Sequence, residues 1–448
     1  MVHSPTTPDL PIDLPPVADG WECAPLGGLI DESRGICYGI VQPGSPQEDG
    51  IPILRVGNIR QGRISTDHVL RVSPEVEAKY SRSRLRGGEV LLTLVGSLGE
   101  SAVVPEELAG WNVARAVAVI PVIEDVGARW VELCLRSATI QHYIRIWATT
   151  TVQATLNLRD LARLPIPLPG PKERKAISCI LGALDDKIEL NGLMNQTLEE
   201  MARTIFKSWF VDFDPVRAKA AGQQPPGLAS QIADLFPDAF QESELGEIPT
   251  GWQVGTLGTI ANEVRDTVQA SEIKRGTPYI ALQHMPRHSI ALASWDLADG
   301  IASAKLRFKA GDLLFGKLRP YFHKVGPAPL DGICSTDIVV SRPLKELWYG
   351  LALGHMSSGA FVDYTYSGST GTKMPRTSWR YMSAFRIALP QTPVAAAFSA
   401  IVRPMISRIW HCIFEQRNLA AVRDTLLPKL ISGESRVPDA EQIVARCT

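Results

Sequence analysis

Residues 171 to 213, PKERKAISCILGALDDKIELNGLMNQTLEEMARTIFKSWFVDF, decide how the rest of the chain is interpreted. Spacings of four and three residues alternate along a mostly apolar series with two central asparagines: Ile177, Leu181, Leu184, Ile188, Asn191, Asn195, Leu198, Ala202 and Ile205. This spacing predicts a helix with a coiled-coil seam. Pro171 and the charged residues after it are typical of a helix start. A helix over 172–208 would be about 55 Å long, and Gly192 would permit a bend in its middle.

The same pattern returns at residues 389–432, LPQTPVAAAFSAIVRPMISRIWHCIFEQRNLAAVRDTLLPKLIS. Leu168 corresponds to Leu389 and Leu198 to Leu419, both at an offset of 221 residues, so the span contains no insertion or deletion. Arg423 breaks the second seam, and its neighbour Val422 can replace it. The second segment lacks a charged start, so its helix is expected to begin differently. The second seam contains Phe398, Val402, Met405, Ile409, Cys412, Gln416, Leu419 and Leu426.

The regions before the two helices are also related. GWECAPLGGLI at 20 corresponds to GWQVGTLGTIA at 251, and ARAVAVIPV at 114 corresponds to STDIVVSRP at 335. These regions are short β-like runs separated by Gly and Pro, with a more helical patch at 125–147. The repeat therefore predicts a tandem duplication with the following segments: an N-terminal tail 1–16, globule 17–167, helix 168–213, linker 214–245, globule 246–388, helix 389–435 and a C-terminal tail 436–448.

Composition excludes several classes of protein. The 448 residues carry a formal net charge of −1, which argues against a wholly basic nucleic-acid coat protein but not against a reader with one basic face. No apolar run is long enough to span a membrane, and the Pro-rich N-terminus does not resemble a signal peptide. The seven scattered cysteines form no C-x-x-C pair, so we expect reduced thiols, no zinc site and a cytoplasmic location.

Catalytic motifs are missing from the sequence. SGSTGTKMP at 367–375 does not meet the Walker spacing, and we interpret it as a polar loop near a ligand. Asp212 and Asp214 are either a solvated helix end, which we favour, or a metal site. Neither a metalloprotease motif nor a nucleophile elbow is present. The sequence therefore predicts a binding protein without catalytic, metal or cofactor residues of its own.

Two similar globules separated by rigid antiparallel helices suit a target with two contact points at a fixed separation, and DNA is such a target. Two alternatives stay open. A protein–protein scaffold with duplicated binding domains would lack salt-dependent DNA affinity. An enzyme fused to a DNA reader would need a nuclease or methyltransferase motif.

Several strings give the chain a resemblance to the specificity subunit of type I restriction–modification enzymes, over residues 18 to 435. They include LPIPLPGPKERKAI, DDKIELNGLMNQTLEEMARTIFKSWFVDFDPVRAK, IADLFPDAFQESELGEIPTGW, GDLLFGKLRPYFHKV, SGSTGTKMPR and RDTLLPKLISGE. The resemblance implies an α+β fold: a tandem repeat of two mixed α/β DNA target-recognition domains, separated by two long antiparallel coiled-coil spacer helices. Each domain would read one half of a bipartite double-stranded DNA site.

The resemblance also implies partners. Two modification subunits, which carry AdoMet and methylate adenine, would bind the helices. Two motor-nuclease subunits, which use ATP and Mg²⁺, would complete a phage-defence complex. A system without the nuclease is equally compatible with the sequence. This chain would be non-catalytic and without a cofactor or a membrane partner.

Candidate DNA-binding residues are donors, acceptors and cations in Gly/Pro-bounded loops. In the first globule they are Arg55, Asn58, Arg60, Thr93, Ser97, Arg115, Gln153, Thr155 and Asn157. In the second they are Gln283, His284, Lys317, Arg319, Tyr321, His323, Lys324, Ser335, Lys373, Arg376 and Trp379. Each has a simpler interpretation as a solvated surface residue, and the case is strongest for the clustered Lys317, Arg319, Lys373 and Arg376.

The helices carry two further predictions. Asn191 and Asn195 either pair across the seam and fix its register or are simply exposed. Trp209, Phe210 and Phe213, with Leu198 and Leu419, are candidates for a subunit interface. The aromatic group can alternatively pack within the chain, which we favour.

Overall fold

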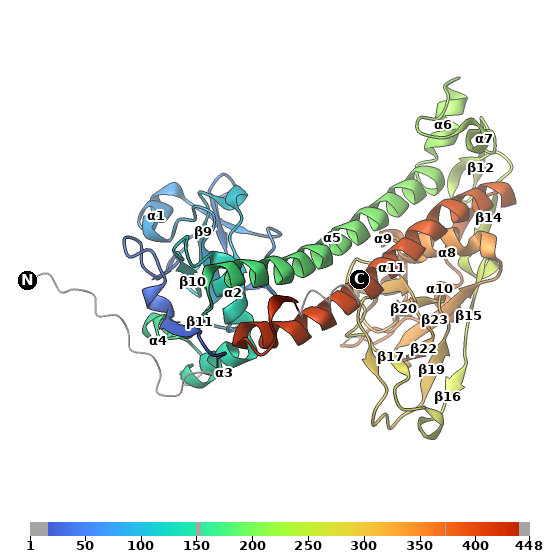
Figure 1. Cartoon of the computed structure of the whole chain (residues 1–448). Coiled ribbons are helices and arrows are strands. Elements are labelled where there is room, and N and C mark those ends of the chain that lie inside the picture. The colour runs from blue at the N-terminus through green and yellow to red at the C-terminus, as the bar shows by residue number, and fades with distance from the viewer. Residues whose placement is uncertain (1–16, 149–153, 372, 439–448) are drawn as a thin grey trace, which may run out of the picture. The chain divides into compact units, whose positions relative to one another are not determined.

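The computed structural model describes residues 17–148, 154–371 and 373–438 (Figure 1). Packing divides the chain into two compact units. Unit 1 comprises residues Met1–Lys187 and Asn418–Thr448, and unit 2 comprises Ile188–Arg417. The division passes through both long helices, so each unit holds a β-rich part and a segment of each helix. The seven segment boundaries given above stay predictions.

Unit 1 is built on a four-stranded sheet of order β2-β10-β7-β8, with smaller sheets β6-β3-β9, β1-β11 and β4-β5. Its helices are α1 (Pro74–Ala78), α2 (Ala128–Arg136), α3 (Ala138–Trp147), α4 (Leu158–Ala162), the start of α5 (Pro171–Phe210) and the end of α11 (Thr392–Ser432). Its strands are β1 (Glu22–Pro25), β2 (Cys37–Tyr38), β3 (Ile51–Leu54), β4 (Ile59–Arg60), β5 (Arg63–Ile64), β6 (Leu70–Val72), β7 (Val90–Thr93), β8 (Ser101–Val103), β9 (Asn112–Val113), β10 (Val117–Ile120) and β11 (Pro165–Leu168).

Unit 2 contains the remainder of α5 and α11 and two larger sheets, of order β15-β23-β20-β21 and β16-β19-β22-β17-β18, with pairs β14-β24 and β12-β13. Its other helices are α6 (Asp214–Ala220), α7 (Ser230–Ala233), α8 (Tyr349–Met356), α9 (Gly359–Ser367) and α10 (Trp379–Met382). Its strands are β12 (Phe240–Ser243), β13 (Gly246–Pro249), β14 (Gln253–Thr256), β15 (Ala261–Glu263), β16 (Thr267–Val268), β17 (Pro278–Ile280), β18 (Asp296–Leu297), β19 (Lys305–Phe308), β20 (Leu313–Gly316), β21 (Val325–Pro327), β22 (Gly332–Cys334), β23 (Ile338–Pro343) and β24 (Arg386–Leu389).

The strand pairing repeats between the units, as the duplication predicts. The order β2-β10-β7-β8 matches β15-β23-β20-β21, and β1-β11 matches β14-β24. The unusual parallel pair β3–β9 recurs as β17–β22. The central strands are wholly buried apolar runs, VLLT and VAVI in unit 1, which is typical of strands covered on both faces. The two units thus share the pairing of these strands, and the sheet of unit 2 extends it with β16 and β19.

Helices α5 and α11 start at equivalent positions, because Pro171 and Thr392 differ by the same 221 residues as their seams. They run in opposite directions inside each unit (Figure 1). In unit 2, residue 191 lies opposite 415 while 206 lies opposite 398. No predicted seam residue is exposed on either helix. The predicted α+β fold with long antiparallel helices is therefore confirmed.

Polar side chains fix the register of the helices in unit 2. Asn191 is buried, and its Nδ2 donates to Glu415 Oε2 at 2.8 Å, so the predicted pairing across the seam is confirmed for Asn191. Asn195 is also buried rather than exposed, but its Oδ1 has no hydrogen-bond partner among the described residues. Gln416 donates to the carbonyl of Ile188 at 2.8 Å. A Cβ on Gly192 would lie 3.3 Å from Gln416 Nε2. Glycine at 192 therefore accommodates Gln416, and α5 continues through this position.

Asp185 is the centre of an ion-pair network in unit 1. Its carboxylate accepts from Arg129 at 2.8 Å, Arg136 at 2.8 Å and Arg423 at 2.9 Å. Burial alone would raise the pKa of Asp185, but the three guanidinium groups outweigh it and lower the pKa. One carboxylate on α5 thereby joins α2 to α11. Arg423, which interrupts the predicted seam, is used for this contact.

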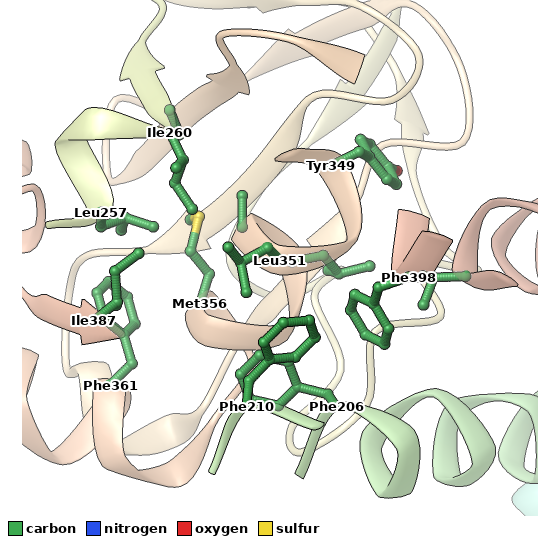
Figure 2. Close-up of a cluster of buried hydrophobic side chains, with 14 of the residues drawn as sticks. Phe206, Phe210, Leu257, Ile260, Tyr349, Leu351, Met356, Phe361, Ile387 and Phe398 are labelled. Carbon is green, nitrogen blue, oxygen red and sulfur yellow. The ribbon is translucent and has the colours of Figure 1, made fainter. Parts of the chain in front are cut away.

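The core of unit 2 is formed where aromatic side chains from both long helices meet the β-rich part (Figure 2). Phe210 and Phe398 are 4.9 Å apart between ring centroids, and Trp209 packs edge-on against Phe236 at 5.0 Å. Phe236 lies in the segment 214–245 that the sequence analysis treats as a linker. Lys219 in this segment bonds the carbonyls of Ala233 and Phe236, so the segment is folded onto the core.

Within the described residues, no helix is long and apolar enough to cross a membrane. The same ranges contain no cluster of His, Cys, Asp and Glu suited to a metal ion. Lys207 pairs with Asp212 at the end of α5, and Asp214 opens α6. Free thiols are present at Cys23, Cys37, Cys134, Cys179 and Cys334.

Candidate nucleic-acid interface

In both units, the loop after the central strand is joined to the polar segment that precedes the next helix. In unit 1, an antiparallel β-bridge links Val95, just after β7, to Thr155. In unit 2, the equivalent bridge links Leu318, just after β20, to Arg376. These loops lie far apart in sequence and carry many of the predicted DNA-binding residues. The fold brings them together twice.

Main-chain hydrogen bonds hold the cations of the unit 2 loops in one place. The Thr377 amide donates to the Lys317 carbonyl at 3.0 Å, and the Arg319 amide donates to the Pro375 carbonyl at 2.8 Å. Arg376 pairs with Asp337 at 3.2 Å and its side chain is 52% exposed. Lys373 is also exposed. The strongest sequence candidates thus lie on one loop pair, and an anion such as a DNA phosphate suits it.

Arg319 has a backbone conformation that ordinary residues avoid. Its φ is +52°, in the left-handed region, and the equivalent residue of the first copy is Gly96 with φ +81°. A non-glycine residue there costs about 1 kcal/mol. The Arg319 Nε is also buried without a hydrogen-bond partner among the described residues. Strained backbone conformations and unpaired buried polar atoms are found mostly at sites where a side chain is needed for function.

Aromatic side chains surround these cations. The Arg287 guanidinium lies 4.0 Å from the Phe322 ring centroid, and Arg319 lies 5.9 Å from it. Tyr321 packs edge-on against Tyr366 at 5.3 Å, and both rings are about half exposed, at 43% and 50%. Exposed aromatic and guanidinium groups offer planar surfaces that suit nucleotide bases.

Two histidines next to this group also have left-handed backbones, His288 at φ +56° and His323 at φ +49°. Their ring centroids are 4.8 Å apart. Burial, with the nearby His288 and Arg203, lowers the pKa of His323, although its ring bonds the Ser357 carbonyl at 2.9 Å. Burial and then Arg287 lower the pKa of Lys324, whose amine donates to the Leu282 carbonyl.

The loop that contains Arg287 and His288 is fastened to α5. Glu199 is buried on this helix and accepts hydrogen bonds from the Ser289 hydroxyl at 2.7 Å and from the Ile290 amide at 3.0 Å. These two hydrogen bonds tie the loop to the helix. Arg287, His288 and Tyr366 were not among the residues predicted from the sequence. The string MPRH, which begins directly after Gln283 and His284, was the available signal for the first two.

Several predicted residues of unit 1 are used inside the fold. Asn58 is buried and donates to the carbonyls of Ser65 and Asp67. Thr93 is buried, and its hydroxyl donates to the Ser97 carbonyl. Asn157 caps α4 by accepting from the Asp160 amide at 2.8 Å. These side chains shape the loops.

Other candidates of unit 1 face outward. Arg55, Arg60, Ser97 and Arg115 are exposed, and Arg55 also donates to the His68 carbonyl at 3.1 Å. Thr155 is half-buried at the bridge to Val95. Gln153 lies outside the described residues.

In unit 2, Gln283 is exposed and His284 is buried, with its Nδ1 accepting from the Ala281 amide at 3.0 Å. Ser335 accepts from the Asp337 amide at 3.2 Å. Trp379 is half-buried and packs against the core. Of this unit's candidates, Tyr321, Lys373 and Arg376 are exposed near the loop bridge.

The candidates for a subunit interface lie inside the chain. Trp209, Phe210 and Phe213 are 2%, 4% and 8% exposed in the core of unit 2, so intrachain packing, which the sequence analysis favoured, is what the structure has. Leu198 packs against the same core, and Leu419 is buried. Elsewhere on α5, the apolar side chains of Leu190, Leu193 and Met201 are exposed.

Comparisons with known proteins agree with this architecture. Residues 45–200 match the family model for the type I restriction modification DNA specificity domain. The specificity subunit of type I restriction enzyme EcoBI from Escherichia coli is 33% identical over 162 residues, which is 36% of this chain and 34% of that protein. The matched stretch thus spans about a third of that relative. The MjaIX specificity subunit from Methanocaldococcus jannaschii is 24% identical over 367 residues, 79% of this chain and 78% of that protein.

The fold is also that of a solved structure. The type I restriction–modification S subunit from M. genitalium superposes with a TM-score of 0.57 at 14% identity, covering 95% of this chain and 98% of that one. Repeat, loop pairs and matched domain together define a DNA specificity protein of duplicated α+β architecture. Residues 45–200 thus match the DNA specificity domain of type I restriction–modification systems, and most of the chain is similar to a specificity subunit of such a system. Such subunits are themselves non-catalytic and carry no cofactor.

Proposed function

We propose that this chain reads a bipartite DNA site, with residues 17–167 recognising one half and residues 246–388 the other. The observation that carries the proposal is the repeated bridge, Val95 to Thr155 and Leu318 to Arg376, which assembles a polar loop pair in each copy. Two copies of one DNA-recognition domain suit a DNA site with two half-sites, whose separation is set by the protein.

The proposed partners are two modification subunits, which use AdoMet to methylate adenine, and two motor-nuclease subunits, which use ATP and Mg²⁺. The proposed location is the cytoplasm, where such a complex meets DNA. The exposed apolar residues of α5 supply one surface for the modification subunits.

Within unit 2, the cations of the loop bridge support contact with DNA. Lys317, Arg319 and Arg376 combine positive charge with a fixed main chain, and Tyr321 adds an exposed ring. A phosphate contact weakens binding to all sequences, whereas a base contact changes specificity at one position. Replacing each residue separately and mapping the methylated motif assigns one of these roles to each.

The test is co-purification with the modification subunit, followed by mapping of methylated adenines across a genome. The expected result is a single split motif with a constant gap. A complex that forms but yields no split motif would remove the role in reading DNA. Absence of both the complex and DNA binding at low salt would favour a protein–protein scaffold.

A further inference from the structure

Unit 1 contains a group of arginines outside the predicted recognition loops. A surface pocket of about 390 Å³ is lined by Ser33, Arg34, Ser81, Arg82, Arg84 and Arg86. The segment 81–86 leads into β7, whereas Ser97 and the bridge to Thr155 follow the other end of that strand. The pocket and the predicted reading loop therefore lie at opposite ends of one central strand.

Two of the arginines build the walls of the pocket. Arg34 donates to Glu89 at 2.6 Å and to the Arg84 carbonyl at 3.0 Å. Arg84 forms a bidentate ion pair with Glu77, in which Nε donates to Oε1 at 2.7 Å and Nη2 donates to Oε2. The Glu77 and Glu89 side chains are 4% and 2% exposed, so their carboxylates lie behind the arginines. These pairs hold the guanidinium groups in place.

The other two arginines supply uncommitted charge. Arg82 is exposed and lines the pocket, and its Nε donates to the Arg34 carbonyl at 2.6 Å, which holds its head group beside Arg34. Arg86 is exposed, and among the described residues its guanidinium has no hydrogen bond or ion pair. The carboxylates that act on these arginines are Glu77, Glu89 and Asp31. Four guanidinium groups against three carboxylates leave one positive charge in surplus, with two hydroxyl donors beside it.

The second copy shows which part of this arrangement belongs to the shared fold. At an offset of 223 residues, Arg82, Arg84 and Arg86 correspond to Lys305, Arg307 and Lys309. In both copies a buried carboxylate accepts the amide three residues earlier at 2.8 Å, Glu89 from Arg86 and Asp312 from Lys309. In unit 2, however, Arg342 of β23 pairs with that carboxylate, and the Lys305 amine is bonded to Ser303. The wall supplied by Arg34 is thus particular to the first copy.

We propose that this arginine pocket binds a phosphoryl group, either a DNA phosphodiester outside the base-reading loops or a free phosphate. Guanidinium forks and hydroxyl donors match tetrahedral oxyanions in geometry and charge. A DNA phosphate held here adds affinity and orientation but no sequence information. The DNA arm of this proposal rests on the proposed function, whereas the free-phosphate arm does not.

The first arm of the test measures DNA binding by the complex with the modification subunit. In the double variant Arg82→Gln/Arg86→Gln, the slope of log Kd against log salt is expected to fall by about one to two. The fall should be equal for specific and non-specific DNA, and the methylated motif should stay the same. Arg159→Gln/Lys172→Gln removes the same charge from exposed positions of unit 1 and is expected to leave the slope unchanged.

The second arm measures the thermal midpoint of the full-length chain in inorganic phosphate against chloride of equal ionic strength. A midpoint that rises in phosphate for the wild type but not for the double variant assigns a free-phosphate site. Unchanged DNA slopes together with unchanged phosphate stabilisation overturn the proposal. If the wild-type complex neither binds nor methylates DNA, the proposed function fails and the phosphate arm alone decides this one.

Discussion

At the scale of single residues, the unit 2 loops have conformations that are unfavourable for stability. Arg319, His288 and His323 are non-glycine residues with positive φ, close to one another in the fold. The first copy avoids this cost with Gly96 in place of Arg319. Function and stability are therefore expected to respond in opposite directions to replacement of Arg319.

Arg319→Gly is expected to leave the free energy of unfolding unchanged or to raise it by about 1 kcal/mol, because relief of the left-handed strain offsets the greater entropy of glycine in the unfolded chain. DNA binding is expected to weaken. Urea unfolding and DNA titration measure the two effects. Arg380→Gly, on exposed α10, is the control and should lose about 1 kcal/mol. A destabilised Arg319→Gly variant would mean that the arginine is structural.

His355 is buried in α8 against Phe206, at 5.0 Å between ring centroids, and its Nε2 has no partner among the described residues. Burial lowers its pKa to about 3. Protonation therefore opposes folding: stability is unaffected above the unfolded pKa near 6.5 and falls by about 1.4 kcal/mol per pH unit below it, until the folded pKa is reached.

His355→Leu removes this protonation. Below pH 6.5 the free energy of unfolding of the variant is therefore expected to fall less steeply than that of the wild type, by about 1.4 kcal/mol per pH unit. Urea midpoints at pH 6.5, 5.5 and 4.5 measure it. His411→Leu, at an exposed position of α11, should keep the wild-type slope. Equal slopes for wild type and His355→Leu would falsify this assignment.

At the scale of elements, Asp185 connects α5 to α2 and α11 within unit 1. Asp185→Asn is expected to destabilise the chain by about 3 kcal/mol, because it removes the buried carboxylate shared by three arginines. The ion pairs that remain to them are longer, at 3.5 and 3.6 Å to Glu132, or solvent-exposed, to Asp424. Since the folded pKa of Asp185 is lowered, this contribution is present above about pH 4 and is lost as pH falls through the folded value.

Chemical denaturation at pH 7 measures the change. Asp186→Asn, on the exposed side of the same helix turn, removes an equal charge and is expected to change stability by less than about 0.5 kcal/mol. Similar losses for both variants would show that the network contributes no more than a surface charge.

At the scale of the whole molecule, α5 and α11 each have residues in both units and are 40 and 41 residues long. A heptad inserted into the first helix keeps every side chain on its face and adds about 10 Å. The methylated split motif is expected to keep both halves while its gap lengthens by up to about three base pairs at 3.4 Å each. The control is a four-residue insertion, which rotates the side chains beyond it relative to those before it. A motif with altered halves would show that the helices do more than set spacing.

Much of this organisation was predictable from the sequence. The seams of α5 and α11, their constant offset and the duplication follow from periodicity and internal similarity, which each segment carries in its own residues. The exposure of individual loop residues was not predictable. Asn58, Thr93 and Asn157 have the same hydrogen-bonding groups as a DNA contact, yet here they bond the main chain.

The sequence by itself therefore determined the two long helices, the repeated β-rich modules and the family, because helix period and repeat offset are properties of residues close in the chain. Only the tertiary structure decided that Trp209 and Phe210 form an intrachain core, that residues 214–245 fold onto it, and that Arg287 joins Arg319 over Phe322. Those outcomes depend on which distant segments meet, and burial and hydrogen bonding there are set by partners that local sequence does not specify.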